Sequence, residues 1–232
     1  MTATLSRRVV AEFIGTGFLV AAVVGSGIMG ERLAGGNVAI ALLADTIATG
    51  AALVVFILTF GPISGAHFNP AVTLVDTIEG GLPWSDAVSY IVAQCVGAIS
   101  GTIAAHLMFT LPLISFSQHE RSGSPQLFSE FVATFGLLSV ILGCSRSRPR
   151  VVPFAVGLYI TAAYWFTAST SFANPAVTIA RCLSDTFAGI RPSDVPGFIV
   201  AQIAGALAAT FLFKWLVHNL GSQAKTVVMA KV

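Results

Sequence analysis

Charged residues are scarce in this sequence. Asp, Glu, Lys and Arg together make up 9% of its 232 residues, whereas about a quarter of the residues in a typical soluble domain are charged. Hydrophobic residues make up 55%, and the mean hydropathy is +0.85. This balance is typical of a protein embedded in a lipid bilayer, and it argues against a water-soluble globular domain.

Several functional signatures are also absent. The sequence has no Gly-x-Ser-x-Gly motif, no His-Glu-x-x-His motif and no pair of catalytic carboxylates, which argues against a membrane-embedded hydrolase and against an enzyme in general. No basic patch with interleaved aromatics indicates nucleic acid. His106, His119 and His218 show no metal-ligand spacing, and three cysteines are an odd number for a disulfide framework. Neither a metal nor another cofactor is expected.

Long apolar stretches are present instead. Each is about long enough to cross a ~30 Å hydrocarbon layer as a helix of about 20 residues. The first is too long for a removable signal peptide and is expected to stay as a helix. The stretches are residues 9–28, 38–60, 87–109, 127–144, 151–168 and 195–217. The sequence therefore predicts an all-α membrane protein with six transmembrane helices.

The distribution of Lys and Arg predicts the orientation. With six spans, both termini lie on one side of the membrane, and the more basic side is cytoplasmic. One side would hold Arg7, Arg8, Arg146, Arg148, Arg150, Lys214, Lys225 and Lys231, and the other Arg32, Arg121, Arg181 and Arg191. This distribution predicts a multi-pass protein of the inner (plasma) membrane with both termini in the cytoplasm.

The chain repeats itself. "SGAHFNPAVTL" at 64–74 matches "TSFANPAVTIA" at 170–180, "AEFIGTGFL" at 11–19 matches "SEFVATFGL" at 129–137, and "SDAVSYIVAQCVGAISG" at 85–101 matches "SDVPGFIVAQIAGALAA" at 193–209. Each half, about 1–110 and about 127–232, contains three spans. Because three is odd, the second half crosses the membrane in the opposite sense. We expect one membrane channel domain, 1–232, built from inverted three-helix repeats.

The repeated motif itself predicts two re-entrant half-helices. A proline in the first turn of a helix needs no N–H partner, so Pro70 and Pro175 suit helix starts and the preceding Asn69 and Asn174 suit N-caps. The segment from Asn69 to Trp84 is too short to cross a membrane, so it must dip in and return. The two motifs are Asn69, Pro70 and Ala71 in the first half, and Asn174, Pro175 and Ala176 in the second.

Two half-helices that meet by their N-termini would favour neutral solutes. Their partial positive charges, about half an elementary charge each, repel cations at the centre of a pore. The side-chain N–H groups of the two asparagines can orient a passing oxygen and so interrupt a proton-conducting water chain. Carbonyl acceptors are expected from Gly65, Ala66, His67, Thr170, Ser171 and Phe172.

These features resemble the aquaporin and aquaglyceroporin (major intrinsic protein) family. The resemblance rests on the two Asn-Pro-Ala motifs, the "SGAHFNPAVT" loop, one glutamate in the first helix of each half, and the inverted repeats. It covers nearly the whole chain and implies a homotetramer in the bilayer with one passive pore per subunit. His67, directly before Phe68, resembles the pore-lining histidine of the family, and a packed histidine is the alternative.

The sequence departs from the family at the outer filter. Where family channels usually carry an arginine, three residues after the second motif asparagine, this chain has Val177, and Thr49 stands where water channels have a bulky aromatic. Ser171 is also small, and the fifth-helix position is either Ala162 or Tyr164. The resemblance thus implies a widened filter without arginine that passes glycerol, urea or metalloid hydroxides, with water as a further candidate solute. The chain looks most similar to channels of bacterial arsenic-resistance gene clusters, which implies arsenite, antimonite or methylated arsenicals.

Three acidic residues within apolar segments leave alternatives open. Asp45 lies one turn outward of Thr49, and it either contacts solute in the outer vestibule or is a carboxylate near the interface, where it is solvated or caps a loop. Glu12 and Glu130 either relay protons, as in a proton-coupled secondary transporter, or accept hydrogen bonds from the re-entrant loops, which the family also implies.

Two residues follow the second motif at the end of its helix. Arg181 is interpreted as a charge at the level of the lipid headgroups that does not replace the missing filter arginine. Cys182 is interpreted as a plain helix-end residue, with a position near the outer mouth as the alternative.

Overall fold

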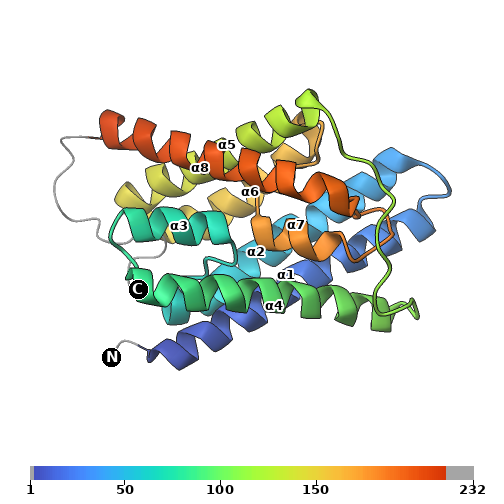
Figure 1. Ribbon diagram of the computed structural model, residues 1–232, viewed down its shortest axis with the longest axis horizontal. Coiled ribbons are helices and arrows are strands. Elements are labelled where there is room, and N and C mark those ends of the chain that lie inside the picture. The colour runs from blue at the N-terminus through green and yellow to red at the C-terminus, as the bar shows by residue number, and fades with distance from the viewer. Residues whose placement is uncertain (1–2, 218–232) are drawn as a thin grey trace.

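The computed structural model describes residues 3–217, and the regular elements within that range are helices (Figure 1). His218, Lys225 and Lys231, whose roles were predicted above, lie outside the described residues. The α-helices are α1 (Leu5–Leu33), α2 (Val38–Ser64), α3 (Pro70–Ile78), α4 (Trp84–Met108), α5 (Ser124–Ser147), α6 (Val152–Phe166), α7 (Pro175–Arg181) and α8 (Val195–Leu216). Two 3₁₀ turns, η1 (Pro149–Val151) and η2 (Pro192–Asp194), precede α6 and α8.

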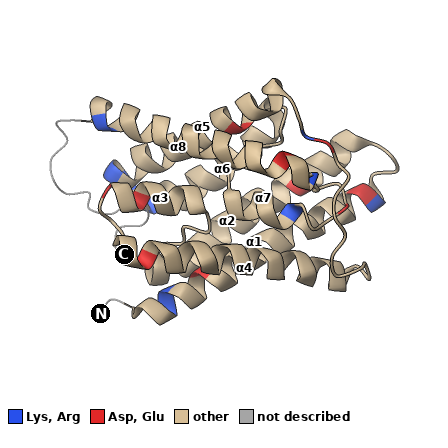
Figure 2. Ribbon diagram, viewed as in Figure 1, with Lys and Arg blue, Asp and Glu red and all other residues tan. Residues whose placement is uncertain are grey.

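Six of these helices correspond to the six predicted spans. Within the described range, α1, α2, α4, α5 and α8 are long and apolar enough to cross a membrane by themselves. The α-helical part of α6 has 15 residues, about 22 Å at 1.5 Å per residue, and η1 directly before it adds length. Figure 2 shows most charged positions toward the ends of the molecule, with few in the middle.

The two halves have matching helix pairs. Helix α1 packs along α4, and α5 packs along α8, while α2 packs against α6 between the halves. Glycines permit the close approach: a Cβ on Gly97 of α4 would lie under 3.0 Å from the Phe13 carbonyl of α1, and a Cβ on Gly205 of α8 equally close to the Phe131 carbonyl of α5. Small residues that let backbones touch are a common device of membrane helices.

Helices α3 and α7 are the two half-helices. They have 9 and 7 residues, and Figure 1 shows them along the long direction of the molecule, one in each half. Each begins at an asparagine N-cap followed by proline: Asn69 Oδ1 accepts from Ala71 N at 2.9 Å, and Asn174 Oδ1 accepts from Ala176 N at 3.0 Å. The predicted fold, six transmembrane helices with two re-entrant half-helices, is confirmed.

Candidate functional site

The loop before each half-helix has an unusual backbone. Ala66 and Phe68 in the first loop have φ of 49° and 49°, and the matching Ser171 and Ala173 in the second have 52° and 47°. Positive φ is uncommon for residues with a Cβ, so surrounding contacts must hold these loops.

A buried carboxylate supplies those contacts in the first half. Glu12 is fully buried, and it accepts hydrogen bonds from His67 N at 3.0 Å and Phe68 N at 2.8 Å. Ser64 Oγ and Gln94 Nε2 donate to the same carboxylate at 2.6 and 2.8 Å. The carboxylate therefore satisfies backbone N–H groups that have no access to bulk water.

The second half repeats the arrangement. Glu130 is also fully buried, and it accepts from Phe172 N and Ala173 N, both at 2.9 Å, and from Gln202 Nε2 at 2.6 Å. In a trans peptide, N–H and the preceding C=O point in opposite directions. The carbonyls of Ala66 and His67, like those of Ser171 and Phe172, therefore point away from the carboxylates.

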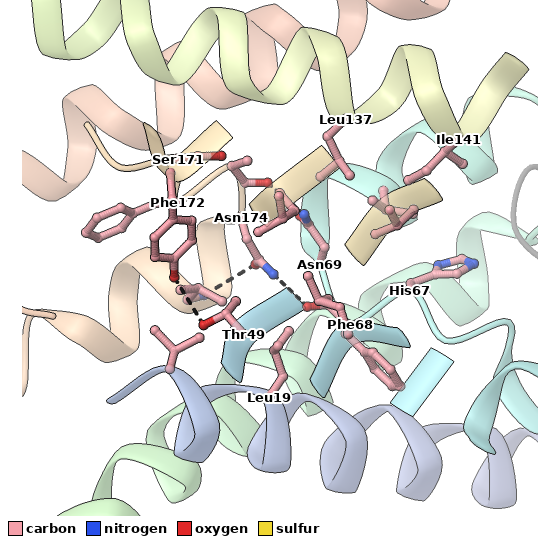
Figure 3. A pocket seen from close by; sticks show the side chains of 18 of the residues that line it. Leu19, Thr49, His67, Phe68, Asn69, Leu137, Ile141, Ser171, Phe172 and Asn174 are labelled. Atoms are coloured by element: carbon pink, nitrogen blue, oxygen red, sulfur yellow. Dashed lines mark hydrogen bonds between the residues drawn. The ribbon is translucent and has the colours of Figure 1, made fainter. Parts of the chain in front are cut away.

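Crossed hydrogen bonds join the two asparagines to the opposite loops. Asn69 Nδ2 donates to Ala173 O at 2.7 Å, and Asn174 Nδ2 donates to Phe68 O at 2.7 Å. Figure 3 shows the two asparagines next to one another in the interior. An amide carries two N–H bonds, so each asparagine keeps one for another acceptor.

These asparagines line an internal cavity. The volume open to the centre of a water-sized molecule is about 60 Å³, several times the ~10–15 Å³ that one water requires. Its polar or aromatic lining residues are Thr49, His67, Phe68, Asn69, Tyr164, Ser171, Phe172, Asn174 and Arg181. Its apolar lining residues are Leu19, Val23, Leu53, Val72, Leu137, Ile141, Val156, Ile160, Ala173 and Val177.

Some predicted site residues shape the cavity without lining it. The alanines and prolines of the motifs form the first turns of the half-helices, and three loop residues and Asp45 are not among the lining residues. These residues are Pro70, Ala71, Pro175, Ala176, Gly65, Ala66, Thr170 and Asp45. Of the two fifth-helix alternatives, Ala162 is exposed on the outside of α6, whereas Tyr164 lines the cavity, with its hydroxyl 3.4 Å from Thr49 Oγ1.

Asp45 matches neither description considered from the sequence. It is 1% exposed, so it is not solvated, and it does not line the cavity. Ser26 Oγ donates to Asp45 Oδ1 at 2.9 Å, and Thr49 Oγ1 donates to the same atom at 3.3 Å. The carboxylate thus acts on the cavity through Thr49.

The interpretation of Arg181 as a headgroup-level charge is wrong. Its side chain is among the largest fully buried ones of the protein, and it lines the cavity. The sequence carried a signal for this position: Arg181 lies four residues after Val177, and residues at i and i+4 share a helix face.

The histidines have distinct surroundings. His67 lines the cavity, with Nδ1 3.0 Å from Thr73 Oγ1 and Nε2 3.4 Å from Asp76 Oδ2. His106 is buried outside the cavity, where Nε2 lies 2.8 Å from Ser184 Oγ and Nδ1 lies 2.7 Å from Pro112 O. Among the described residues, no group of His, Cys, Asp and Glu could hold a metal ion.

The architecture and the paired half-helices can now be compared with known proteins. A family model described as Major intrinsic protein matches residues 1–171 and 149–232. The chain belongs to the major intrinsic protein family. As a member of this family it is a multi-pass membrane channel for small neutral solutes, and it is not an enzyme.

Individual relatives agree with the family match. The chain is 57% identical over 214 residues to aquaglyceroporin AqpS of Rhizobium meliloti, covering 92% of this chain and 91% of that one. It is 32% identical to a probable aquaporin of Archaeoglobus fulgidus, covering 93% and 99%. The X-ray structure of the aquaglyceroporin from Plasmodium falciparum has the same fold, with a TM-score of 0.73, 23% identity, and coverage of 94% and 99%.

Proposed function

We propose that this member of the major intrinsic protein family is a passive channel for neutral solutes larger than water: glycerol, urea, and trivalent metalloid hydroxides such as arsenite, antimonite and methylated arsenicals. The observation that carries the proposal is the composition of the cavity wall. Val177 and Thr49, which stand where family channels usually carry an arginine and an aromatic residue, line the cavity together with mostly apolar side chains and a few hydrogen-bonding groups.

This wall suits molecules that are themselves amphipathic. The amides of Asn69 and Asn174 can donate to a hydroxyl oxygen, while Leu137 and Ile141 offer apolar surface to the rest of the solute. Few precisely placed polar groups in an apolar site are the usual means of orienting a small ligand. A relative with 57% identity is named an aquaglyceroporin, which agrees with the proposal.

The acidic residues support a passive channel over a proton-coupled transporter. Glu12 and Glu130 hold the re-entrant loops through several hydrogen bonds each, and Asp45 is not among the residues that line the cavity. Solute accumulation against its gradient in vesicles with an imposed pH difference would contradict the channel mechanism. We expect equilibration only.

The apolar perimeter supports the remaining proposals on assembly and location. Large hydrophobic side chains are exposed along the outer helices, among them Leu43, Ile47, Leu158 and Trp165, and a bilayer or neighbouring subunits would cover them. We propose a homotetramer in the inner (plasma) membrane with both termini cytoplasmic. Cross-linking in native membranes and protease access to tagged termini test these two points.

Val177→Arg tests the proposed filter. Val177 lines the cavity from the first turn of α7, so a long cationic side chain there should fill the passage. In proteoliposome swelling assays we expect glycerol, urea and arsenite permeability to fall by roughly tenfold or more, equivalent to at least about 1.4 kcal/mol on the barrier.

The control for this experiment is Val177→Leu, which adds one carbon and no charge. We expect it to retain most of the flux, with water measured in parallel for each variant. Unchanged permeability to every solute in the arginine variant would show that residue 177 does not bound the path.

A further inference from the structure

A guanidinium lines the cavity, although the usual filter position holds valine. Val177 and Arg181 stand one turn apart on α7, and both line the cavity. Four residues correspond to about 6 Å along the helix axis, and the Arg181 side chain, which leans toward the N-terminus of α7, reaches the Phe172 ring. The Arg181 side chain is buried, with 2% of the residue exposed.

The Arg181 side chain is held from several directions. Its Nε donates to Ala188 O, and its guanidinium carbon lies 3.4 Å from the centroid of the Phe172 ring. The guanidinium also interacts with the Tyr164 hydroxyl. Stacking on an aromatic face favours a cation that is weakly hydrated, as guanidinium is. These contacts fix the charge in place.

A second arginine provides a natural comparison. Arg121, in the loop between α4 and α5, lies 5.0 Å from the centroid of the same Phe172 ring. It donates to Gly189 O at 2.8 Å and to Ser169 O at 3.1 Å, but it does not line the cavity. Burial, together with the Arg181 charge, lowers the pKa of Arg121 to about 9, which leaves it charged at neutral pH.

The carboxyl group of Asp45 lies close enough to Arg181 for the two side chains to interact electrostatically. A carboxylate only accepts hydrogen bonds, so Thr49 Oγ1 must donate to Asp45 at 3.3 Å. Thr49 therefore accepts from the Tyr164 hydroxyl at 3.4 Å. Both distances are long for O–H···O bonds. Because Tyr164 is the donor in its contact with Thr49, the lone pairs of its oxygen remain available to the Arg181 guanidinium or to a solute.

The two halves differ at this position. Counting seven residues from each motif asparagine gives Asp76 in the first half and Arg181 in the second, and counting two residues back gives His67 and Phe172. In both halves these partners meet: His67 Nε2 lies 3.4 Å from Asp76, and Arg181 stacks on Phe172. Equivalent positions of the two half-helices thus hold a carboxylate, Asp76, in the first half and a guanidinium, Arg181, in the second.

We propose that Arg181 is the charge-selecting residue of this channel. It lies one turn beyond Val177 on α7, and it supplies the fixed positive charge that the usual filter position lacks. Asp45, which Thr49 positions by a hydrogen bond, offsets part of this charge by direct electrostatic attraction. The passage is therefore wide at Val177 and electropositive at Arg181, so larger neutral solutes enter while protons and metal cations are repelled. This inference rests on the proposed channel function.

Arg181→Gln tests the inference in proteoliposomes. We measure proton influx with an internal pH-sensitive dye under an imposed potential, together with glycerol swelling. Loss of the fixed charge should raise the ratio of proton influx to glycerol permeability, both measured on the same vesicles, roughly tenfold. Arg181→Lys keeps a charge and should remain near the wild-type ratio, and Arg121→Gln, outside the cavity, should do so as well.

The outcomes separate the inference from the proposed function. Wild-type vesicles impermeable to glycerol would refute the proposed function itself. Glycerol-permeable vesicles in which Arg181→Gln leaves the ratio of proton influx to glycerol permeability unchanged would overturn only the role of Arg181, and so would an equal rise in Arg121→Gln.

Asp45→Asn gives a second measurement if substitutions at Arg181 do not fold. With its counter-charge removed, the Arg181 charge should raise chloride permeability several-fold and leave proton influx no higher than in the wild type. Chloride permeability equal to that of the wild type would overturn the proposal.

Discussion

Glu12→Leu is expected to abolish the folded channel. Leucine has about the same size as glutamate but offers no hydrogen-bond acceptor. The donors left without a partner are Ser64 Oγ, His67 N, Phe68 N and Gln94 Nε2. Each buried donor left without a partner costs about 1–3 kcal/mol. Two backbone and two side-chain donors together approach the ~5–15 kcal/mol that stabilises a typical protein.

The measurement is thermal unfolding and gel-filtration profile in detergent. Glu31→Leu, an exposed position on the same helix α1, is the matched control and should behave as the wild type. Glu12→Gln retains one acceptor oxygen and should be intermediate, and Glu130→Leu should match Glu12→Leu because it holds the equivalent loop. Equal unfolding temperatures for Glu12→Leu and Glu31→Leu would refute the loop-holding role.

Gly97→Val should have the next largest effect. A Cβ at Gly97 would lie under 3.0 Å from the backbone carbonyl of Phe13, and Phe13 cannot retreat easily because the adjacent Glu12 is tied to the first loop. Overpacking of this kind costs about 1–3 kcal/mol or more. For a chain of this size, about 3 kcal/mol lowers the unfolding temperature by roughly 6–12 °C.

A helical glycine without such a neighbour provides the control. A Cβ on Gly25 of α1 would meet the Phe109 ring at 3.5 Å, which is ordinary contact, so Gly25→Ala should unfold within about 2 °C of the wild type. Gly205→Val in the second half should repeat the loss seen for Gly97→Val. Stable Gly97→Val and Gly205→Val variants would mean that α1 and α4, and likewise α5 and α8, are less tightly apposed.

The fold could be predicted because its signals are local. Hydropathy locates spans by length, and Asn69 and Asn174 before proline mark helix starts whatever surrounds them. The helix ends differ by a few residues from the ends of the apolar stretches. Helix α1 ends at Leu33 rather than at residue 28, because the helix continues through Gly30 and Arg32 beyond the apolar stretch. The duplication then implies the inverted arrangement without any knowledge of packing.

The site was predicted less completely because its decisive contacts are tertiary. The burial of Asp45 depends on Ser26 from α1, and that of Arg181 depends on Phe172 and Ala188, none of which is a helix-face neighbour in sequence. A charge near a helix end is usually solvated, and in the sequence this expectation outweighs the signal from the spacing of Arg181 and Val177 along one helix face. In the structure α7 is short and lies within the protein, so its last residue, Arg181, is buried.

The crossed amide bonds between the loops also bear on biosynthesis. The partner of Asn69, Ala173 O, is 104 residues further along the chain, so it is synthesised only after the whole first half. Until then the first re-entrant loop and α3 lack the final hydrogen-bond partner of Asn69. Insertion of the second half is therefore the step that commits the newly made protein to its finished form.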